Sequence, residues 1–170
     1  MKDFKINSQE LLVLQKEQYR HDQRNHSDIA CLAKSDRLKH YGLHFAKYVG
    51  RLARGSTPEQ PVERTVVDTA LVGLSAANTL HQHLEAVVLP AQANSLQLDP
   101  ILTFADAAGR FADACEKIDH LEEFLPIAKR ANADIVNWAL HMAAERRFDL
   151  VSSMRIRRAE LADRQFFIAD

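Results

Sequence analysis

The chain has 170 residues, of which 46% are hydrophobic, 26% charged and 7% aromatic, a composition typical of one globular domain with a sizeable core. Its 22 Lys and Arg residues nearly balance its 23 Asp and Glu residues, and the formal net charge is −1. This balance argues against a broad basic surface for a nucleic-acid polymer. The low counts of five Gly and five Pro favour long, uninterrupted helices.

The sequence favours a cytoplasmic protein. No stretch approaches the roughly 18 apolar residues of a membrane span, and the first residues mix acids and bases where a signal peptide needs an apolar run. Cys31 and Cys115 form neither a disulfide framework nor a zinc-binding spacing, and we expect both side chains to be buried.

Helical periodicity runs through most of the chain, and no strand-like alternation of any length competes with it. Ser8 is expected to cap a first helix that ends near Tyr19. The polar stretch 18–26 is expected to form an exposed connection, after which Ser27 and Ser35 are the next candidate caps.

Two long amphipathic helices are predicted next, separated by a loop over 55–61. The first follows Ser35 and ends near Gly55, and the second covers about 62–88. The apolar stripe of the first helix contains Leu38, Tyr41, Phe45, Tyr48, Val49 and Leu52. The buried face of the second contains Val67, Ala70, Leu71, Leu74, Ala77, Leu80 and Leu84. The other side of the second helix is also rather apolar, so we expect it to pack on more than one side.

The second half of the chain follows a similar plan. The stretch 91–99 is expected to be a linker or a functional loop. A third helix is predicted from about Ile101 to Phe124, and Pro126 fits the first turn of a fourth. Asp149 is expected to cap a last helix.

The sequence therefore predicts an all-α fold, a bundle of about five to six helices with two long helical hairpins that repeat. The helical domain is placed at 35–165, with possible repeats at 36–88 and 101–150. An N-terminal helical extension (1–34) precedes it, and a short tail (166–170) follows. An offset of 66 residues aligns the hairpins without a gap, and places Phe45 on Phe111 and Asp68 on Asp134.

Asp68 and Asp134 each stand near the head of an apolar helical run. An Asp at this position can favour the helix N-terminal dipole. The alternative is an inward carboxylate that binds a divalent cation between helices, together with further oxygen ligands. The residues alone leave both interpretations open.

The chain resembles the MazG-like all-α nucleoside triphosphate pyrophosphohydrolases over most of residues 36–160. In that family one helix carries closely spaced glutamates, and the next carries Glu-x-x-Asp before an apolar run. The stretches 108–113 and 131–140 resemble these two elements, and 44–47 and 65–68 form a similar pair. The resemblance implies a MazG-like fold and a homodimer.

This chain departs from the family at most of the carboxylates. His44 and Lys47 stand in the glutamate positions of one half, and Arg110 and Asp113 in those of the other. Glu116 follows Asp113 on the same helix face and can replace a missing ligand. A site of Asp113, Glu116, Asp134 and Asn137, with Asp68 in the first half, is therefore the predicted metal centre. The literal match Glu160-x-x-Asp163 is instead expected to be an exposed C-terminal turn.

The resemblance implies that Mg²⁺ or Mn²⁺ assists attack of water on a nucleoside triphosphate, with release of a monophosphate and pyrophosphate. Asp113, Glu116 and Asp134 are the candidate catalytic residues. The basic side chains expected to meet the phosphates are His44, Lys47, Arg155, Arg157 and Arg158. The alternative is a helical scaffold that has lost catalysis and binds a nucleotide or a partner protein.

His40 and His44 share one helical face, a spacing that can bind zinc. The general base and third ligand of the zinc hydrolases are not evident in the sequence. We therefore expect these histidines to face solvent or to be hydrogen-bonded.

Overall fold

The computed structural model describes residues 6–87 and 99–164, and within these ranges the chain forms seven α-helices, one 3-10 turn and no strand. The all-α class predicted from the sequence is therefore confirmed for this part of the chain. The expected number of about five to six helices is too low, because the chain also forms a short helix of four residues at Ser27–Ala30. The elements are α1 (Ser8–Asn25), α2 (Ser27–Ala30), α3 (Lys34–Arg54), α4 (Val62–Thr79), η1 (Leu84–Ala86), α5 (Pro100–Asp119), α6 (Leu125–Glu145) and α7 (Leu150–Ala162).

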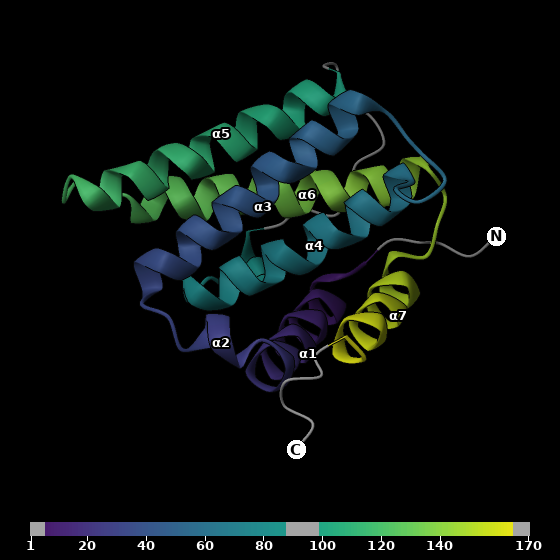
Figure 1. Ribbon diagram of the computed structural model, residues 1–170, viewed down its shortest axis with the longest axis horizontal. Helices are drawn as coiled ribbons and strands as arrows, with labels where there is room; N and C mark the ends of the chain where they lie inside the picture. The colour runs from purple at the N-terminus through teal and green to yellow at the C-terminus, as the bar shows by residue number, and fades with distance from the viewer. Residues whose placement is uncertain (1–5, 88–98, 165–170) are drawn as a thin grey trace.

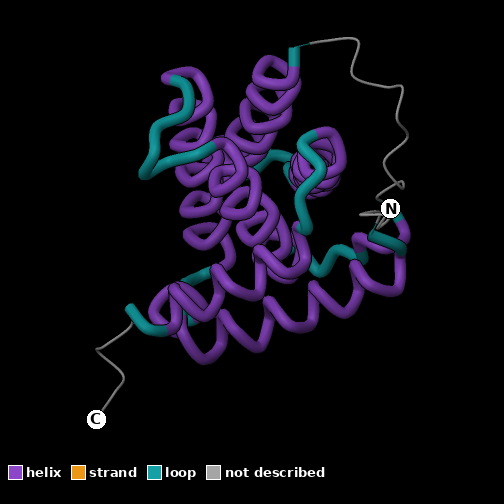
Figure 2. The backbone as a smooth tube through the Cα atoms, turned by 90° about the vertical axis from the view of Figure 1, so that its right-hand side faces the viewer, coloured by secondary structure: helices purple, strands orange, loops and turns teal. Residues whose placement is uncertain are grey.

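Helices α3, α4, α5 and α6 form the centre of the molecule. The hairpin of α3 and α4 lies against the hairpin of α5 and α6, so that α3 packs on α5 and α4 packs on α6 (Figure 1). Helices α1 and α7 lie side by side against α4, at the foot of the bundle in both Figure 1 and Figure 2. Helix α4 is thus covered from several directions, as its apolar character on both sides predicts.

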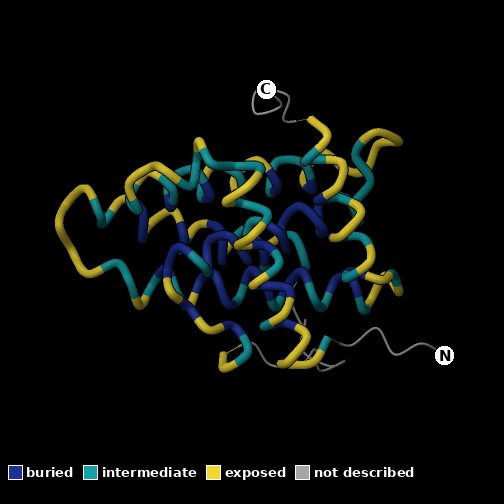
Figure 3. The backbone as a smooth tube through the Cα atoms, turned by 90° about the horizontal axis from the view of Figure 1, so that it is seen from below, coloured by how far each residue is buried: buried dark blue, intermediate teal, exposed yellow. Residues whose placement is uncertain are grey.

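The buried residues form one core between the helices, and Figure 3 colours the backbone dark blue where these residues lie. Phe45 of α3 meets Phe111 of α5 edge to face, with ring centroids 5.1 Å apart. Trp138 stacks on Phe104 at 4.4 Å and donates its indole N–H to the carbonyl oxygen of Pro100. Leu11 and Leu14 of α1 belong to the same core, so the N-terminal helices pack on the central bundle.

Local sequence explains where the helices begin and end. The side chain of Asn7, one residue before the expected cap, accepts a hydrogen bond from the backbone N–H of Glu10. The Glu10 side chain in turn accepts one from the backbone N–H of Asn7. Asp149 caps α7 as predicted, by accepting from the backbone N–H of Ser152. Helix α3 ends before Gly55, whose φ of +87° suits glycine.

The expectation of an exposed connection over 18–26 is wrong, because α1 continues to Asn25. Gln18 is buried there and donates from Nε2 to Asp22 Oδ1 at 2.8 Å and to Ser75 Oγ at 3.2 Å. Polar side chains can face the interior of a protein when neighbouring elements satisfy their hydrogen bonds. The last two turns of α1 therefore pack through hydrogen bonds, which apolar periodicity does not detect.

The predicted second helix also ends earlier than expected, at Thr79 rather than near Val88. The chain turns after Thr79, where the backbone N–H of Gln82 donates a hydrogen bond to the carbonyl oxygen of Ala77 and His81 has a φ of +49°. The Gln82 side chain donates to the carbonyl oxygen of Lys129 and accepts from Asn132, so α6 holds the turn in place. Val88 and residues 91–98 of the expected loop lie outside the described residues, as does the tail.

Two further expectations are corrected. The third helix ends at Asp119 rather than near Phe124, because the turn passes through Leu121 at a φ of +58°. Cys115 is buried as expected, whereas Cys31 is exposed. Pro126 lies in the first turn of α6, as predicted. Among the described helices, none is both long and apolar enough to cross a membrane.

Candidate functional site

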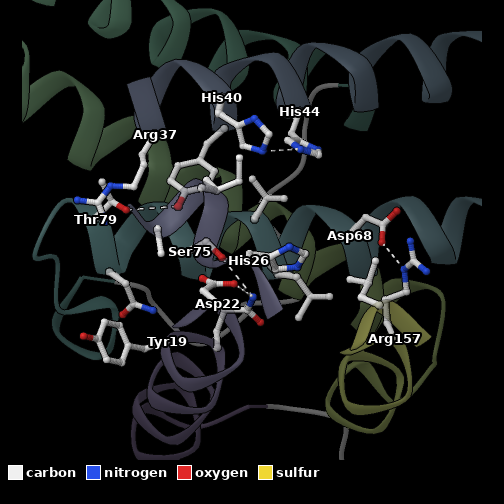
Figure 4. A pocket seen from close by; sticks show the side chains of 18 of the residues that line it. Tyr19, Asp22, His26, Arg37, His40, His44, Asp68, Ser75, Thr79 and Arg157 are labelled. Atoms are coloured by element: carbon white, nitrogen blue, oxygen red, sulfur yellow. Dashed lines mark hydrogen bonds and ion pairs between the residues drawn. The ribbon is translucent and has the colours of Figure 1, made fainter. Parts of the chain in front are cut away.

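A cavity of about 510 Å³ opens between helices α1 and α2 on one side and α3 and α4 on the other, and residues of α7 line one end (Figure 4). Small-molecule sites in proteins commonly have volumes of about 300–1,000 Å³. We call this cavity the α3 pocket, because one polar stripe of α3 runs along it. That stripe consists of Arg37, His40, His44, Lys47 and Arg51.

Positive charge is concentrated in the α3 pocket. Its lining includes five cationic side chains, Arg37, Lys47, Arg51, Arg157 and Arg164, and two carboxylates, Asp22 and Asp68. The chain as a whole carries a formal charge of −1, so this excess is a local property. A partly enclosed cavity whose lining has an excess of one charge attracts ligands of the opposite charge.

Asp68 lies at one end of the pocket and is only 6% exposed. Arg157 of α7 donates from Nε to Asp68 Oδ1 at 2.8 Å, and Arg51 of α3 donates from Nη1 to Oδ2 at 3.1 Å. Both carboxylate oxygens are therefore bonded to guanidinium groups. A divalent cation that binds Asp68 has to displace at least one of them.

A row of imidazole and phenol groups follows along α3. The Nε2 atoms of His40 and His44 are 3.1 Å apart, and His44 Nδ1 lies 3.1 Å from Tyr48 Oη and 3.0 Å from Lys47 Nζ. Burial, together with the Lys47 charge, lowers the pKa of His44 to about 4. Burial also lowers the pKa of His40 and raises that of Tyr48. At neutral pH this row is uncharged except for Lys47.

Asp22 of α1 faces the middle of the pocket near Ser75 of α4 (Figure 4). Burial raises the pKa of this carboxyl group, against the opposing hydrogen bonds from Ser75 and Gln18. Its negative charge is thus disfavoured relative to that of an exposed Asp.

Arg37 lies at the opposite end of the pocket from Arg157, close to Thr79 (Figure 4). Tyr41 Oη and Thr79 Oγ1 are 3.4 Å apart in the same region. The Nε atom of Arg37 is buried and has no hydrogen-bond partner among the described residues. An unsatisfied buried donor costs free energy, which a ligand oxygen can recover.

Four of the residues predicted from the sequence line the α3 pocket: His44, Lys47, Asp68 and Arg157. Arg157 is one of the three arginines expected to meet phosphate. The other two do not line the pocket. Arg155 bonds to Glu17 at 2.9 Å, and Arg158, 8% exposed, bonds to Glu17 at 2.8 Å and to Gln18 at 2.9 Å. These two arginines connect α7 to α1.

The other predicted residues lie on α5 and α6, away from the pocket lining. The side chains of Asp113 and Glu116 are 52% and 73% exposed, and Asp134 Oδ2 bonds to Arg110 at 2.9 Å. Asn137 follows one turn after Asp134 on α6 and is partly buried. Within the described ranges, no three His, Cys, Asp or Glu side chains are grouped so that they could hold a metal ion. The structure thus does not gather Asp113, Glu116 and Asp134 into one such group.

Glu160 and Asp163 are exposed as expected, although only Asp163 lies in a turn, because α7 continues through Glu160 to Ala162. Sequence reasoning overlooked Arg37, Arg51 and Asp22. The signal for the first two is the spacing of the polar stripe on α3, which advances by three and four residues beside the apolar stripe. No comparable pattern marks Asp22, which reaches the pocket only because α1 is longer than predicted.

Comparison of the chain with models of known protein families, with curated proteins and with solved structures finds no match.

Proposed function

We propose that the α3 pocket binds a nucleotide or a similar small organic phosphate. The observation that carries this proposal is the excess of cationic side chains in a partly enclosed cavity of nucleotide size. Guanidinium groups pair with phosphate oxygens in a bidentate manner, and a lysine ammonium binds them as a point charge. The proposal corresponds to the non-enzymatic alternative drawn from the sequence.

The two ends of the pocket differ in what they offer a ligand. Lys47, Arg51 and Arg157 lie toward one end, and of these only Lys47 has no acidic partner among the described residues. The phosphate groups are assigned to this end. The apolar part of the lining includes Leu71 and Val72 of α4, which suit the flat face of a base.

The test is a calorimetric titration of the full chain with a panel of ribonucleoside and deoxyribonucleoside triphosphates in low salt. Lys47→Gln removes one phosphate contact from an exposed side chain, so the fold is expected to survive. Loss of one charge-assisted contact, worth about 1.5–3 kcal/mol, weakens binding by about tenfold or more.

The matched control is Arg130→Gln, which removes one positive charge from an exposed position on α6 outside the pocket. Wild-type affinity is expected for this variant. Equal loss of affinity in both variants means that nucleotide binding depends only on the net charge of the protein, and the proposal then fails. Absence of binding across the whole panel contradicts it as well.

Hydrolysis of the bound nucleotide is the second candidate, and the observation in its favour is that Asp68 lies at the cation-rich end beside Lys47 and Arg51. In the MazG-like interpretation, Mg²⁺ or Mn²⁺ binds there or at the carboxylates on α5 and α6. Pyrophosphate release that needs the metal and is abolished by Asp68→Ala or Asp134→Ala, but not by Asp163→Ala, would support it. The MazG-like fold, the duplicated hairpin and the homodimer likewise stay predictions.

A further inference from the structure

The polar stripe of α3 contains a pair of histidines that the proposed nucleotide site does not use. His40 and His44 are four residues apart, so their side chains lie one above the other on the same face of the helix. Both line the α3 pocket, where their rings meet edge to face with centroids 4.7 Å apart (Figure 4). Their Nε2 atoms are 3.1 Å apart.

From this geometry we infer that His40 and His44 form a two-histidine site for a transition-metal ion, with Zn²⁺ as the representative ion. Zinc–imidazole bonds are about 2.0–2.1 Å long, so one ion equidistant from both Nε2 atoms has an N–Zn–N angle of roughly 100°. This angle lies between the octahedral and tetrahedral values. The ion replaces the hydrogen bond between the two Nε2 atoms, and the rings turn so that both lone pairs point at it.

The surroundings of the pair keep both imidazoles in the neutral form, in which they can act as metal ligands. Burial favours the uncharged form of both imidazoles, which is the form that binds metals. When Nε2 of His44 binds the ion, the ring proton has to reside on Nδ1, and Tyr48 Oη at 3.1 Å can accept it. Hydrogen bonds of this kind fix the orientation of metal-binding histidines.

Lys47 opposes the metal. Its Nζ lies 3.0 Å from Nδ1 of His44, and an ammonium group cannot donate to a ring nitrogen that already carries a proton. Lys47 therefore has to turn away when the ion binds, and its charge also repels the cation. Removal of this ammonium group is expected to tighten zinc binding.

The site has two protein ligands, and within the described ranges no third His, Cys, Asp or Glu completes a group around them. Water molecules or an oxygen atom of a ligand in the pocket fill the remaining coordination positions of the ion. An ion held in this way exchanges its other ligands readily, as in open rather than closed zinc sites.

The experiment is a zinc titration of the 170-residue chain without nucleotide, followed by competition with a zinc indicator and by ¹⁵N NMR of the histidine rings. Wild type is expected to bind one zinc ion, and the Nε2 resonances of His40 and His44 are expected to shift together. His40→Ala and His44→Ala should each weaken zinc binding more than tenfold. His81→Asn, which changes an exposed histidine of the same pocket at a φ that Asn tolerates, should bind as wild type does.

Lys47→Gln separates this inference from the proposed function, because it is expected to tighten zinc binding several-fold while it weakens nucleotide binding. Zinc binding that persists in both alanine variants, or that is lost in His81→Asn or His26→Asn instead, overturns the site. A wild-type protein that binds no zinc overturns it too, whether or not a nucleotide binds.

Discussion

At the scale of single residues, the α3 pocket shows how burial changes the charge state of histidines and carboxyl groups. Asp22 and His44 carry opposite charges when ionised, yet burial favours the neutral form of each. The cations of the lining are held differently, because Arg51 and Arg157 share the carboxylate of Asp68. The pocket thus keeps its arginine charges at neutral pH, while burial keeps the imidazoles of His40 and His44 uncharged.

His21 provides a test of this effect outside the polar stripe of α3. Burial first, and then the nearby His26 and Arg158, lower its pKa to about 4, whereas an unfolded histidine has a pKa near 6.5. The unfolded state therefore binds more protons between these values, and the stability that neutral His21 contributes at pH 7 is lost as the pH falls toward 4.

We expect the free energy of unfolding in urea to fall from pH 7 to pH 5, with about 1 kcal/mol of the fall due to His21 after allowance for its partial exposure. In His21→Gln the fall should be smaller by that amount. Parallel pH dependence in the two proteins would show that the His21 ring gains its proton as readily in the folded state as in the unfolded one.

At the scale of elements, the contact between α4 and α6 depends on a glycine. A Cβ atom added at Gly73 would lie 2.7 Å from Cγ2 of Val136, closer than van der Waals contact allows. Asn132 of α6 also donates to the carbonyl oxygen of Gly73 at 3.0 Å. The two helices approach each other closely at this point, because no side chain separates them.

Gly73→Ala is expected to destabilise the protein by about 1–3 kcal/mol, the usual cost of overpacking. The matched control is Gly109→Ala on α5, where a new Cβ meets nothing within 4 Å. That variant should gain about 0.5–1 kcal/mol, because alanine loses less backbone entropy in a helix than glycine does. Urea denaturation measures both changes, and equal effects would mean that the close approach at Gly73 is absent.

Most elements could be predicted from the sequence, and the errors have a common physical cause. Apolar spacing predicted the buried residues of α3 and α4, because each stripe advances with the helical repeat. It failed where polar side chains are buried, at Gln18 in α1 and at Gln82 after α4. Apart from Asp22, which lies one turn after Gln18, their side-chain partners lie on elements distant in sequence, so local patterns carry little information about them.

At the scale of the whole molecule, Asp68 connects three helices. It belongs to α4 and bonds to Arg51 of α3 and to Arg157 of α7, so it ties the C-terminal helix to the bundle at one end of the pocket. The sequence singled out Asp68 as a metal ligand, since a carboxylate at the head of an apolar helix fits that role. The two arginine partners come from residues 17 positions before it and 89 positions after it, which no local pattern relates to Asp68.

Asp68→Asn is expected to destabilise the protein by about 2 kcal/mol, below the ~3–5 kcal/mol of a fully buried pair because Arg51 is partly exposed. Glu160→Gln is the control, since Glu160 bonds to the same Arg157 at 2.9 Å but is 45% exposed. Its effect should stay within about 0.5 kcal/mol. A smaller loss of stability for Asp68→Asn than for Glu160→Gln in thermal or urea unfolding would contradict this role for Asp68.

The candidate site was therefore only half predictable. His44, Lys47 and Asp68 come together in the pocket because α3 and α4 are neighbours in sequence and pack as a hairpin. Arg157 and Asp22 reach it from α7 and α1, through packing that becomes visible only in three dimensions.

The most direct test of the pocket as the ligand site is a titration of the ¹⁵N-labelled protein with the nucleotide that binds most tightly, followed by backbone NMR shifts. Our account predicts that the largest shifts lie on the α3 stripe from Arg37 to Arg51 and around Asp68. Shifts confined to the face of α5 and α6 that carries Asp113 and Asp134 would contradict it.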